Sequence, residues 1–191
     1  MQFQAFAAGV EVNGQTVLSV MEGMKSARWV AEQMLAAEGI KDPVVGEWYK
    51  QQAWLNAFKA ISEKVGVLTL RKIGNSIPDN ADWPPNVIDI PSALAAIDVA
   101  YHLNHRIGGK ILFDMATGAF TEGIGHYTYT NVDDHHGTMV CKNPYPCDFD
   151  LGIIESAAAK FKPAGSNLKV SHDAGACRKR GHGSCTYQIS W

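Results

Sequence analysis

The chain has 191 residues, a length that suits one domain with a sizeable core. Hydrophobic residues make up 46% and charged residues 19%, which is an ordinary globular composition and excludes a disordered or fibrous chain. The formal net charge is −2, so the chain lacks the basic surface that nucleic-acid binding requires. It also lacks an apolar run of membrane-spanning length and the features of a signal peptide, so we expect a soluble cytoplasmic protein.

The first half of the chain is predicted to be mainly helical. Asn13-Gly14 favours the tight turn of a hairpin between two stretches of β character. Apolar residues such as Trp54 and Phe58 recur at the spacing of one buried helical stripe, and Pro91 suits the first position of a helix. The predicted elements are therefore a hairpin within residues 3–20, helices at 27–38, 48–65 and 91–106, and a proline-rich loop at 77–90.

The second half changes from a helical period to a period of two. Strands are predicted at residues 111–115, 126–132, 138–142, 168–172 and 184–191, and a short helix at 150–161. The expected fold class is α+β: a single domain, 1–191, in which a helical N-terminal part (1–109) packs on a C-terminal antiparallel sheet with one inserted helix (110–191).

All four cysteines lie in the last third of the chain. Cys141 and Cys147 flank a proline-rich turn, and Cys177 and Cys185 flank a basic, glycine-rich loop. Two such pairs on turns are what a tetrahedral thiolate site for zinc requires. The alternatives are disulfides, which the expected cytoplasmic location disfavours, and small buried hydrophobic side chains.

The stretch from Cys147 to Trp191 resembles the C-terminal part of the 4-vinyl-reductase domain. That family is related in fold to TRAPP-type trafficking subunits and, more distantly, to haem-NO-binding domains. The resemblance lies in Cys147 and the Gly152 that follows it, and in Cys177 and Cys185 around a seven-residue loop. It implies that these three cysteines bind zinc, with a Glu as the fourth ligand in the sensory members.

No Glu occupies that fourth position in this sequence. The choice lies between Cys141, which we favour because a fourth thiolate completes a common structural set, and His172. A site with four protein ligands is closed, so the zinc would be structural and would stabilise the closing segment of the fold.

The resemblance also implies an apolar ligand pocket between the helices and the sheet, for a hydrophobic or aromatic small molecule. The leading interpretation is a stand-alone sensor or carrier that works as a homodimer, as TRAPP-like proteins do, and is not an enzyme. The residues expected to line the pocket are Trp54, Phe58, Tyr101, His102, Phe113 and Tyr127.

Two other functions remain open. The first is a haem-binding gas sensor or haem enzyme, because His102 on a helix before an antiparallel sheet resembles the proximal His of haem-NO-binding domains. Those domains hold the haem propionates with a Tyr-x-Ser-x-Arg motif, whereas the nearest stretch here, Tyr127 to Asn131, lacks both the Ser and the Arg. The second is a dimeric scaffold subunit without a ligand.

Overall fold

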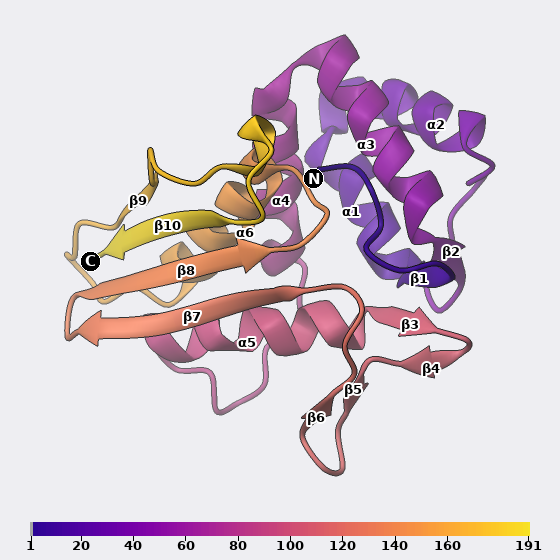
Figure 1. The fold of residues 1–191 in the computed structure, drawn as a ribbon. Helices are drawn as coiled ribbons and strands as arrows, with labels where there is room; N and C mark the ends of the chain where they lie inside the picture. The colour runs from indigo at the N-terminus through magenta and orange to yellow at the C-terminus, as the bar shows by residue number, and fades with distance from the viewer. Residues whose placement is uncertain (1) are drawn as a thin grey trace.

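A computed structural model describes residues 2–191 of the chain. The first half is mainly helical and the second half carries the larger sheet, so the predicted α+β class is confirmed (Figure 1). The N-terminal elements, in chain order, are β1 (Val10–Asn13), α1 (Gly14–Gly23), a short 3₁₀ turn (Lys25–Ala27), α2 (Arg28–Ala37), β2 (Trp48–Lys50), α3 (Gln51–Val65), α4 (Val67–Asp79) and α5 (Ile90–Leu103).

The C-terminal half builds the sheet against which α5 packs (Figure 1). Its elements are β3 (His105–Ile107), β4 (Lys110–Ile111), β5 (Phe113–Asp114), β6 (Ala119–Phe120), β7 (His126–Asp133), β8 (His136–Lys142), α6 (Cys147–Lys160), β9 (Lys169–His172), a second 3₁₀ turn (Arg178–Arg180) and β10 (Cys185–Ser190). Four of these strands form an antiparallel sheet in the order β7-β8-β10-β9.

The sheet buries one of its faces beneath α5 and α6. Along β10 the buried positions alternate as Cys185, Tyr187 and Ile189, and on β8 Met139 and Cys141 face the same way. A period of two with one covered face is the pattern of an antiparallel sheet packed on helices. The helical layer therefore lies against one side of the sheet, and the core fills the space between them.

Helices α4 and α6 approach each other unusually closely, and two glycines allow it. A Cβ at Gly74 would lie 2.1 Å from the carbonyl oxygen of Phe149, and a Cβ at Gly152 would lie 2.1 Å from that of Arg71. Because each glycine faces the backbone of the partner helix, no side chain fits at either position. This contact fixes α6, and with it Cys147 at the first turn of that helix, against the helical half.

The expected N-terminal hairpin is wrong. Asn13 does not enter a tight turn but caps α1, its side-chain oxygen accepting a hydrogen bond from the backbone N–H of Gln15 at 2.9 Å. Asn is among the best N-cap residues, so Asn-Gly here marks a helix start. Strand β1 instead pairs with β2 and β3, which come from distant parts of the sequence.

Element boundaries also differ from expectation, and the helix predicted at 91–106 ends at Leu103, before strand β3 begins at His105. The stretch predicted as one helix from Trp48 begins with strand β2, and α3 starts only at Gln51. The expected loop begins later, because α4 continues to Asp79 with Pro78 in its last turn.

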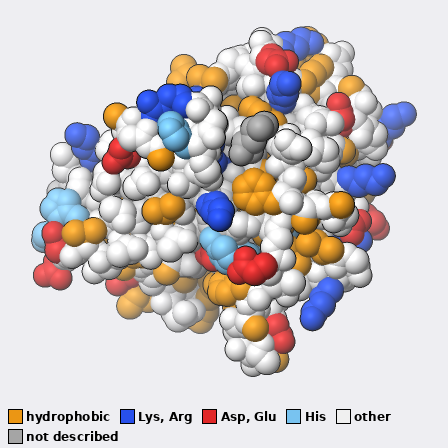
Figure 2. Space-filling view, in the orientation of Figure 1, with side chains coloured by type: hydrophobic (Ala, Val, Ile, Leu, Met, Phe, Trp, Pro, Cys, Tyr) orange, Lys and Arg blue, Asp and Glu red, His pale blue; other side chains and the backbone are white. Residues whose placement is uncertain are grey.

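The surface seen in Figure 2 carries small groups of hydrophobic side chains between scattered charged ones of both signs. In the described part of the chain, none of the helices combines the length and the apolar composition that crossing a bilayer demands.

Candidate functional site

Helix α5 places a histidine deep in the core. The helix begins with a capping box, in which Asp89 accepts a hydrogen bond from the backbone N–H of Ser92 at 2.8 Å, and Pro91 stands in its first turn as predicted. Its buried stripe continues from Leu94 to His102. The His102 side chain is 0% exposed, so the helix carries an imidazole into the interior.

The imidazole of His102 has one nitrogen bonded and one free. Its Nδ1 lies 2.8 Å from the backbone carbonyl oxygen of Asp98. A carbonyl oxygen only accepts, so Nδ1 carries the hydrogen and Nε2 carries the lone pair. Burial lowers the pKa of His102, which favours the neutral ring. Nε2 is buried and has no hydrogen-bond partner among residues 2–191.

His105, on the strand that follows, is the contrasting case. Its Nδ1 donates to the carbonyl oxygen of Tyr101 at 2.7 Å, and its Nε2 lies 2.8 Å from the hydroxyl of Tyr145. Burial lowers the pKa of His105 to about 4. Both ring nitrogens of His105 therefore have hydrogen-bond partners. Of the two histidines, His102 is the one whose Nε2 keeps a free lone pair.

A run of aromatic rings passes through the core next to His102. Phe58 contacts Trp54 with ring centroids 4.6 Å apart, Tyr101 contacts Tyr127 at 5.2 Å, and Phe113 contacts Phe120 at 4.9 Å. The links between these pairs are Phe58 to Tyr145, Tyr145 to Tyr101, Tyr101 to His102, and His102 to Phe120 at 4.8 Å.

All six residues expected to line a pocket therefore fall in one continuous aromatic row. Their rings are in mutual contact. Three hollows of about 260, 250 and 580 Å³ are formed at the surface, and none of these three is lined by His102 or by the other five residues. Polar atoms without partners among residues 2–191 occur at two places along the row: Nε2 of His102 within it, and Nε1 of Trp54 with Oε1 of Gln51 at the Trp54 end.

A buried ion pair lies beside the row. Asp150 on α6 and Arg178 form a salt bridge, and both side chains are 0% exposed. The Tyr127 hydroxyl donates to Asp150 at 2.6 Å, and Arg178 also donates to the backbone carbonyl of Tyr145 at 2.8 Å. Burial raises the pKa of the Asp150 carboxyl, and the Arg178 guanidinium opposes that shift. The pair is fully hydrogen-bonded, as a buried charge pair must be.

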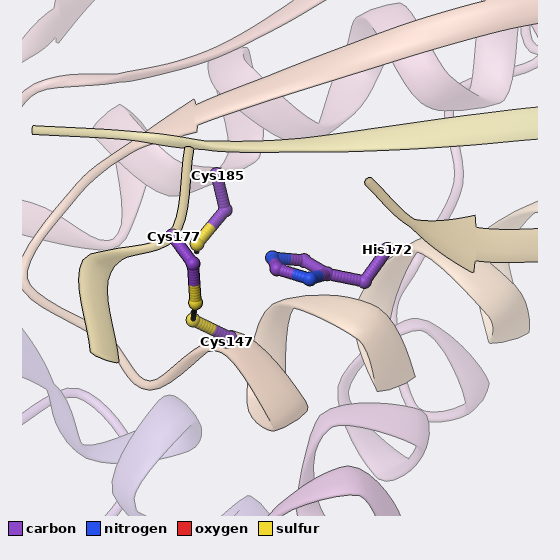
Figure 3. Close-up of side chains that lie close together, drawn as sticks. All are labelled: Cys147, His172, Cys177 and Cys185. Atoms are coloured by element: carbon purple, nitrogen blue, oxygen red, sulfur yellow. Dashed lines mark hydrogen bonds between the residues drawn. The ribbon is translucent and has the colours of Figure 1, made fainter. Parts of the chain in front are cut away.

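Three of the four cysteines meet at the first turn of α6, next to this ion pair (Figure 3). The Sγ of Cys147 lies 3.0 Å from that of Cys185 and 3.7 Å from that of Cys177. His172, from the end of β9, points its ring toward the three thiols, and its Nε2 has no hydrogen-bond partner among residues 2–191. The four ligand atoms lie within 4.8 Å of one another. Three thiols and an imidazole at this spacing are a group that could hold a metal ion.

The structure does not bring Cys141 into this group. Cys141 lies on β8 directly opposite Cys185 in the sheet register, and its thiol is close to the Asp150 carboxylate. Burial, together with that carboxylate, holds the pKa of Cys141 well above its usual range. His172, the second choice for the fourth ligand, is the residue that the fold places beside the other three cysteines.

Several residues of the aromatic row and of the buried ion pair are not predicted from the sequence. Tyr145 and Phe120 link the other rings of the aromatic row. Tyr145 lies in the proline-rich turn, and Phe120 lies in the short hairpin of β5 and β6. The sequence places Arg178 in a basic loop that is expected to be solvated, but its side chain is buried. The basic loop alone gives no sign of this burial, because the partner of Arg178, Asp150, is distant in the sequence.

The chain shares its fold with solved H-NOX structures. An H-NOX protein from S. oneidensis in the Fe(II)NO ligation state matches with a TM-score of 0.63 at 16% identity, over 93% of this chain and 98% of that one. A structure from a study of haem distortion in the H-NOX family matches at 0.64 and 21% identity, over 94% of both chains. A variant of T. tengcongensis H-NOX matches at 0.60 and 20% identity, over 93% and 96%. No family model and no protein of curated function matches the sequence.

These matches correct the expected resemblance. The strong structural likeness is to H-NOX domains, so the expectation of a 4-vinyl-reductase domain with a TRAPP-like fold is wrong. The cysteine motif that carried it covers about a quarter of the chain and is local. Such a motif does not distinguish related folds. Zinc as the main cofactor, ranked above haem, depended on that resemblance and is corrected with it.

Proposed function

We propose that this chain is a haem-binding sensor domain for a diatomic gas, with His102 as the axial ligand. One observation carries the proposal: the buried Nε2 of His102 keeps its lone pair and has no hydrogen-bond partner among residues 2–191. The shared fold supports it, since several of the similar structures are described as haem proteins and one is in an Fe(II)NO state.

The residues around His102 fit an iron ligand. A metal-binding histidine usually donates its second ring N–H to a carbonyl or a carboxylate, which fixes the tautomer and the ring orientation. Nδ1 of His102 does this with the carbonyl oxygen of Asp98 at 2.8 Å. A neutral imidazole with Nε2 free is the form that binds a metal.

Two features of this chain differ from the pattern of haem-NO-binding domains. The Tyr127 hydroxyl is already bonded to Asp150, and Asn131 stands where that pattern has Arg, so the propionates need other partners. The Phe120 ring packs against His102 with ring centroids 4.8 Å apart, and none of the three surface hollows is lined by His102, so binding of a porphyrin requires side chains there to move. Phe120 is 40% exposed in a hairpin of two-residue strands, so the movement costs little buried area.

Haem held by His102 would supply an iron that can bind a diatomic gas. The role of the protein residues is to hold the imidazole and to keep water away from it. Tyr101 and Phe120 flank the ring with centroids 5.3 and 4.8 Å away, and the His126 ring lies 4.8 Å away, so neighbouring rings enclose the imidazole.

Absorption spectroscopy of the reduced, haem-reconstituted protein tests the proposal. We expect one haem per chain, an intense Soret band, and a shift of that band on adding carbon monoxide. His102→Gly should lose the band and regain it with added imidazole, whereas His135→Ala, at an exposed turn, should keep it. Failure of the wild-type chain to bind haem, or an unchanged spectrum in His102→Gly, would overturn the proposal.

A second proposal concerns the cysteine–histidine cluster. We propose that Cys147, Cys177, Cys185 and His172 hold a metal ion in a closed, structural site. The observation that favours it is the convergence of four ligand atoms within 4.8 Å, together with the free Nε2 of His172. Elemental analysis of the purified protein, without assuming which metal is present, tests it. One equivalent of a single metal is expected, and a metal-free folded protein would contradict the proposal.

The homodimer remains a prediction. Native mass spectrometry of the haem-loaded protein would report subunit number and bound ligand together. A mass of one chain at micromolar concentration would contradict it.

A further inference from the structure

The carboxylate of Asp98 lies where α5 meets β7, and it contacts both. Its Oδ1 accepts a hydrogen bond from the backbone N–H of Tyr127 at 2.9 Å. Its Oδ2 lies 2.8 Å from Nδ1 of His126, the first residue of β7. One side chain thus joins the helix that carries His102 to the edge strand of the sheet.

The same residue also holds His102. Its backbone carbonyl accepts the Nδ1–H of His102, and its Oδ1 lies 3.5 Å from that nitrogen. The negative charge of Asp98 is therefore next to the ring N–H. The Asp98 side chain is only 16% exposed, so water screens this attraction incompletely. A charge at this place favours the tautomer with hydrogen on Nδ1 and leaves Nε2 with its lone pair.

The position of the Asp98 carboxylate is itself fixed by its neighbours. His126 lies between two carboxylates, with Nδ1 2.8 Å from Asp98 and Nε2 3.1 Å from Glu122. Carboxylate oxygens only accept, so both ring nitrogens of His126 donate. The rings of His126 and His102 lie with centroids 4.8 Å apart, and Phe120 covers both. The Asp98 carboxylate therefore has little freedom to rotate away from His102.

We propose that Asp98 is a positioning residue that holds His102 as the Nδ1–H tautomer, with Nε2 free for a metal. This inference rests on the proposed haem function for the identity of the metal, but the tautomer itself is a property of the haem-free chain. Partners of this kind typically change metal affinity 10- to 100-fold when they are removed.

The test compares Asp98→Asn with a matched control, Asp133→Asn. The amide keeps the shape of the side chain and removes its charge. Asp133 makes a similar contact, 2.8 Å to Nδ1 of His136, but it lies at the exposed end of β7, at the opposite end of the strand from His126. In the haem-free protein, nitrogen NMR of labelled histidines should show His102 as the Nδ1–H tautomer in wild type and in Asp133→Asn. In Asp98→Asn a fraction of the Nε2–H tautomer should appear, because the backbone carbonyl of residue 98 then holds the Nδ1–H form without the help of the charge.

In the haem-loaded protein we expect Asp98→Asn to weaken haem affinity about 10-fold or more and to lower the iron–histidine stretching frequency. Asp98→Glu, which keeps the charge, should restore both at least in part. A tautomer and a haem affinity unchanged in Asp98→Asn would overturn the positioning role. A simple structural link between α5 and β7 would change the melting temperature without changing the tautomer, and that result would also overturn it.

The experiments distinguish a failure of the proposed haem function from a failure of the proposed role of Asp98. If wild-type protein binds no haem, the proposed function fails, while the tautomer in the haem-free chain still decides the role of Asp98. If Asp98→Asn does not fold, the tautomer of His102 in the haem-free wild-type chain still tests the proposal. An Nε2–H tautomer there would overturn it.

Discussion

The His102 region and the cysteine cluster are both buried and rich in ligand atoms, but they are assembled in different ways. His102 and its partner Asp98 lie one turn apart on a single helix, and their hydrogen bond forms as soon as α5 does. The cysteine cluster draws its four residues from α6, β9, the loop after β9, and β10. A local pair can therefore place one lone pair precisely, whereas a four-ligand set depends on the whole C-terminal topology.

The largest effect should come from breaking the cluster. Cys177→Ser should remove the metal and destabilise the fold by about 4 kcal/mol, because the ligand set ties α6 and the loop after β9 to the paired strands β9 and β10. Elemental analysis and urea denaturation measure both effects. Cys141→Ser, a buried cysteine outside the cluster, should keep its metal. Equal metal content in wild type and Cys177→Ser would refute the assigned ligands.

The next effect belongs to the His102 region and depends on pH. The pKa of His105 falls to about 4 in the folded protein, against 6.5 when it is exposed, so the unfolded chain binds the extra proton between these values. His105 therefore contributes its full stability above pH 6.5, and up to about 3 kcal/mol is lost as the pH falls toward 4. Urea denaturation at several pH values should show this loss, and His105→Phe should reduce it. The same slope in both proteins would be evidence against a buried neutral His105.

A third change tests the contact between α4 and α6, which places Cys147 relative to the helical half. Gly152→Ala puts a methyl group against the Arg71 carbonyl and should cost about 2 kcal/mol. At Gly183 a Cβ meets no atom within 4 Å and the backbone is compatible with alanine, so Gly183→Ala is the control. If the two variants melt at the same temperature, the close approach of the helices is wrong.

The smallest effect on stability should come from Phe120→Ala. Because the ring is 40% exposed, its loss should cost about 1 kcal/mol or less. The ring covers His102, so its removal should speed haem uptake in stopped-flow absorption experiments. Phe113→Ala, in the same hairpin but one ring further from His102, is the matched control. Slower uptake in Phe120→Ala than in Phe113→Ala would argue against Phe120 as the cover.

Much of the fold was predictable because it follows from local patterns. The stripe through Trp54 and Phe58 identified α3, and Pro91 marked the start of α5. The hairpin expected at Asn13 failed because Asn-Gly suits both a tight turn and a helix N-cap, and only the distant strands β2 and β3 decide between them. The cysteine motif failed as evidence of family, because it is a local pattern in about a quarter of the chain and carries no information on the rest of the fold.

The sequence by itself determined the fold class, the helix that carries His102, and the clustering of cysteines near the C-terminus, since periodicity and spacing are local properties. Only the tertiary structure decided that His172 and not Cys141 faces the other thiols, and that Arg178 lies buried against Asp150. It also decided that Nε2 of His102 is left without a partner among residues 2–191. Each of these depends on which segments meet in space, and contacts between distant segments leave no periodic signal along the chain.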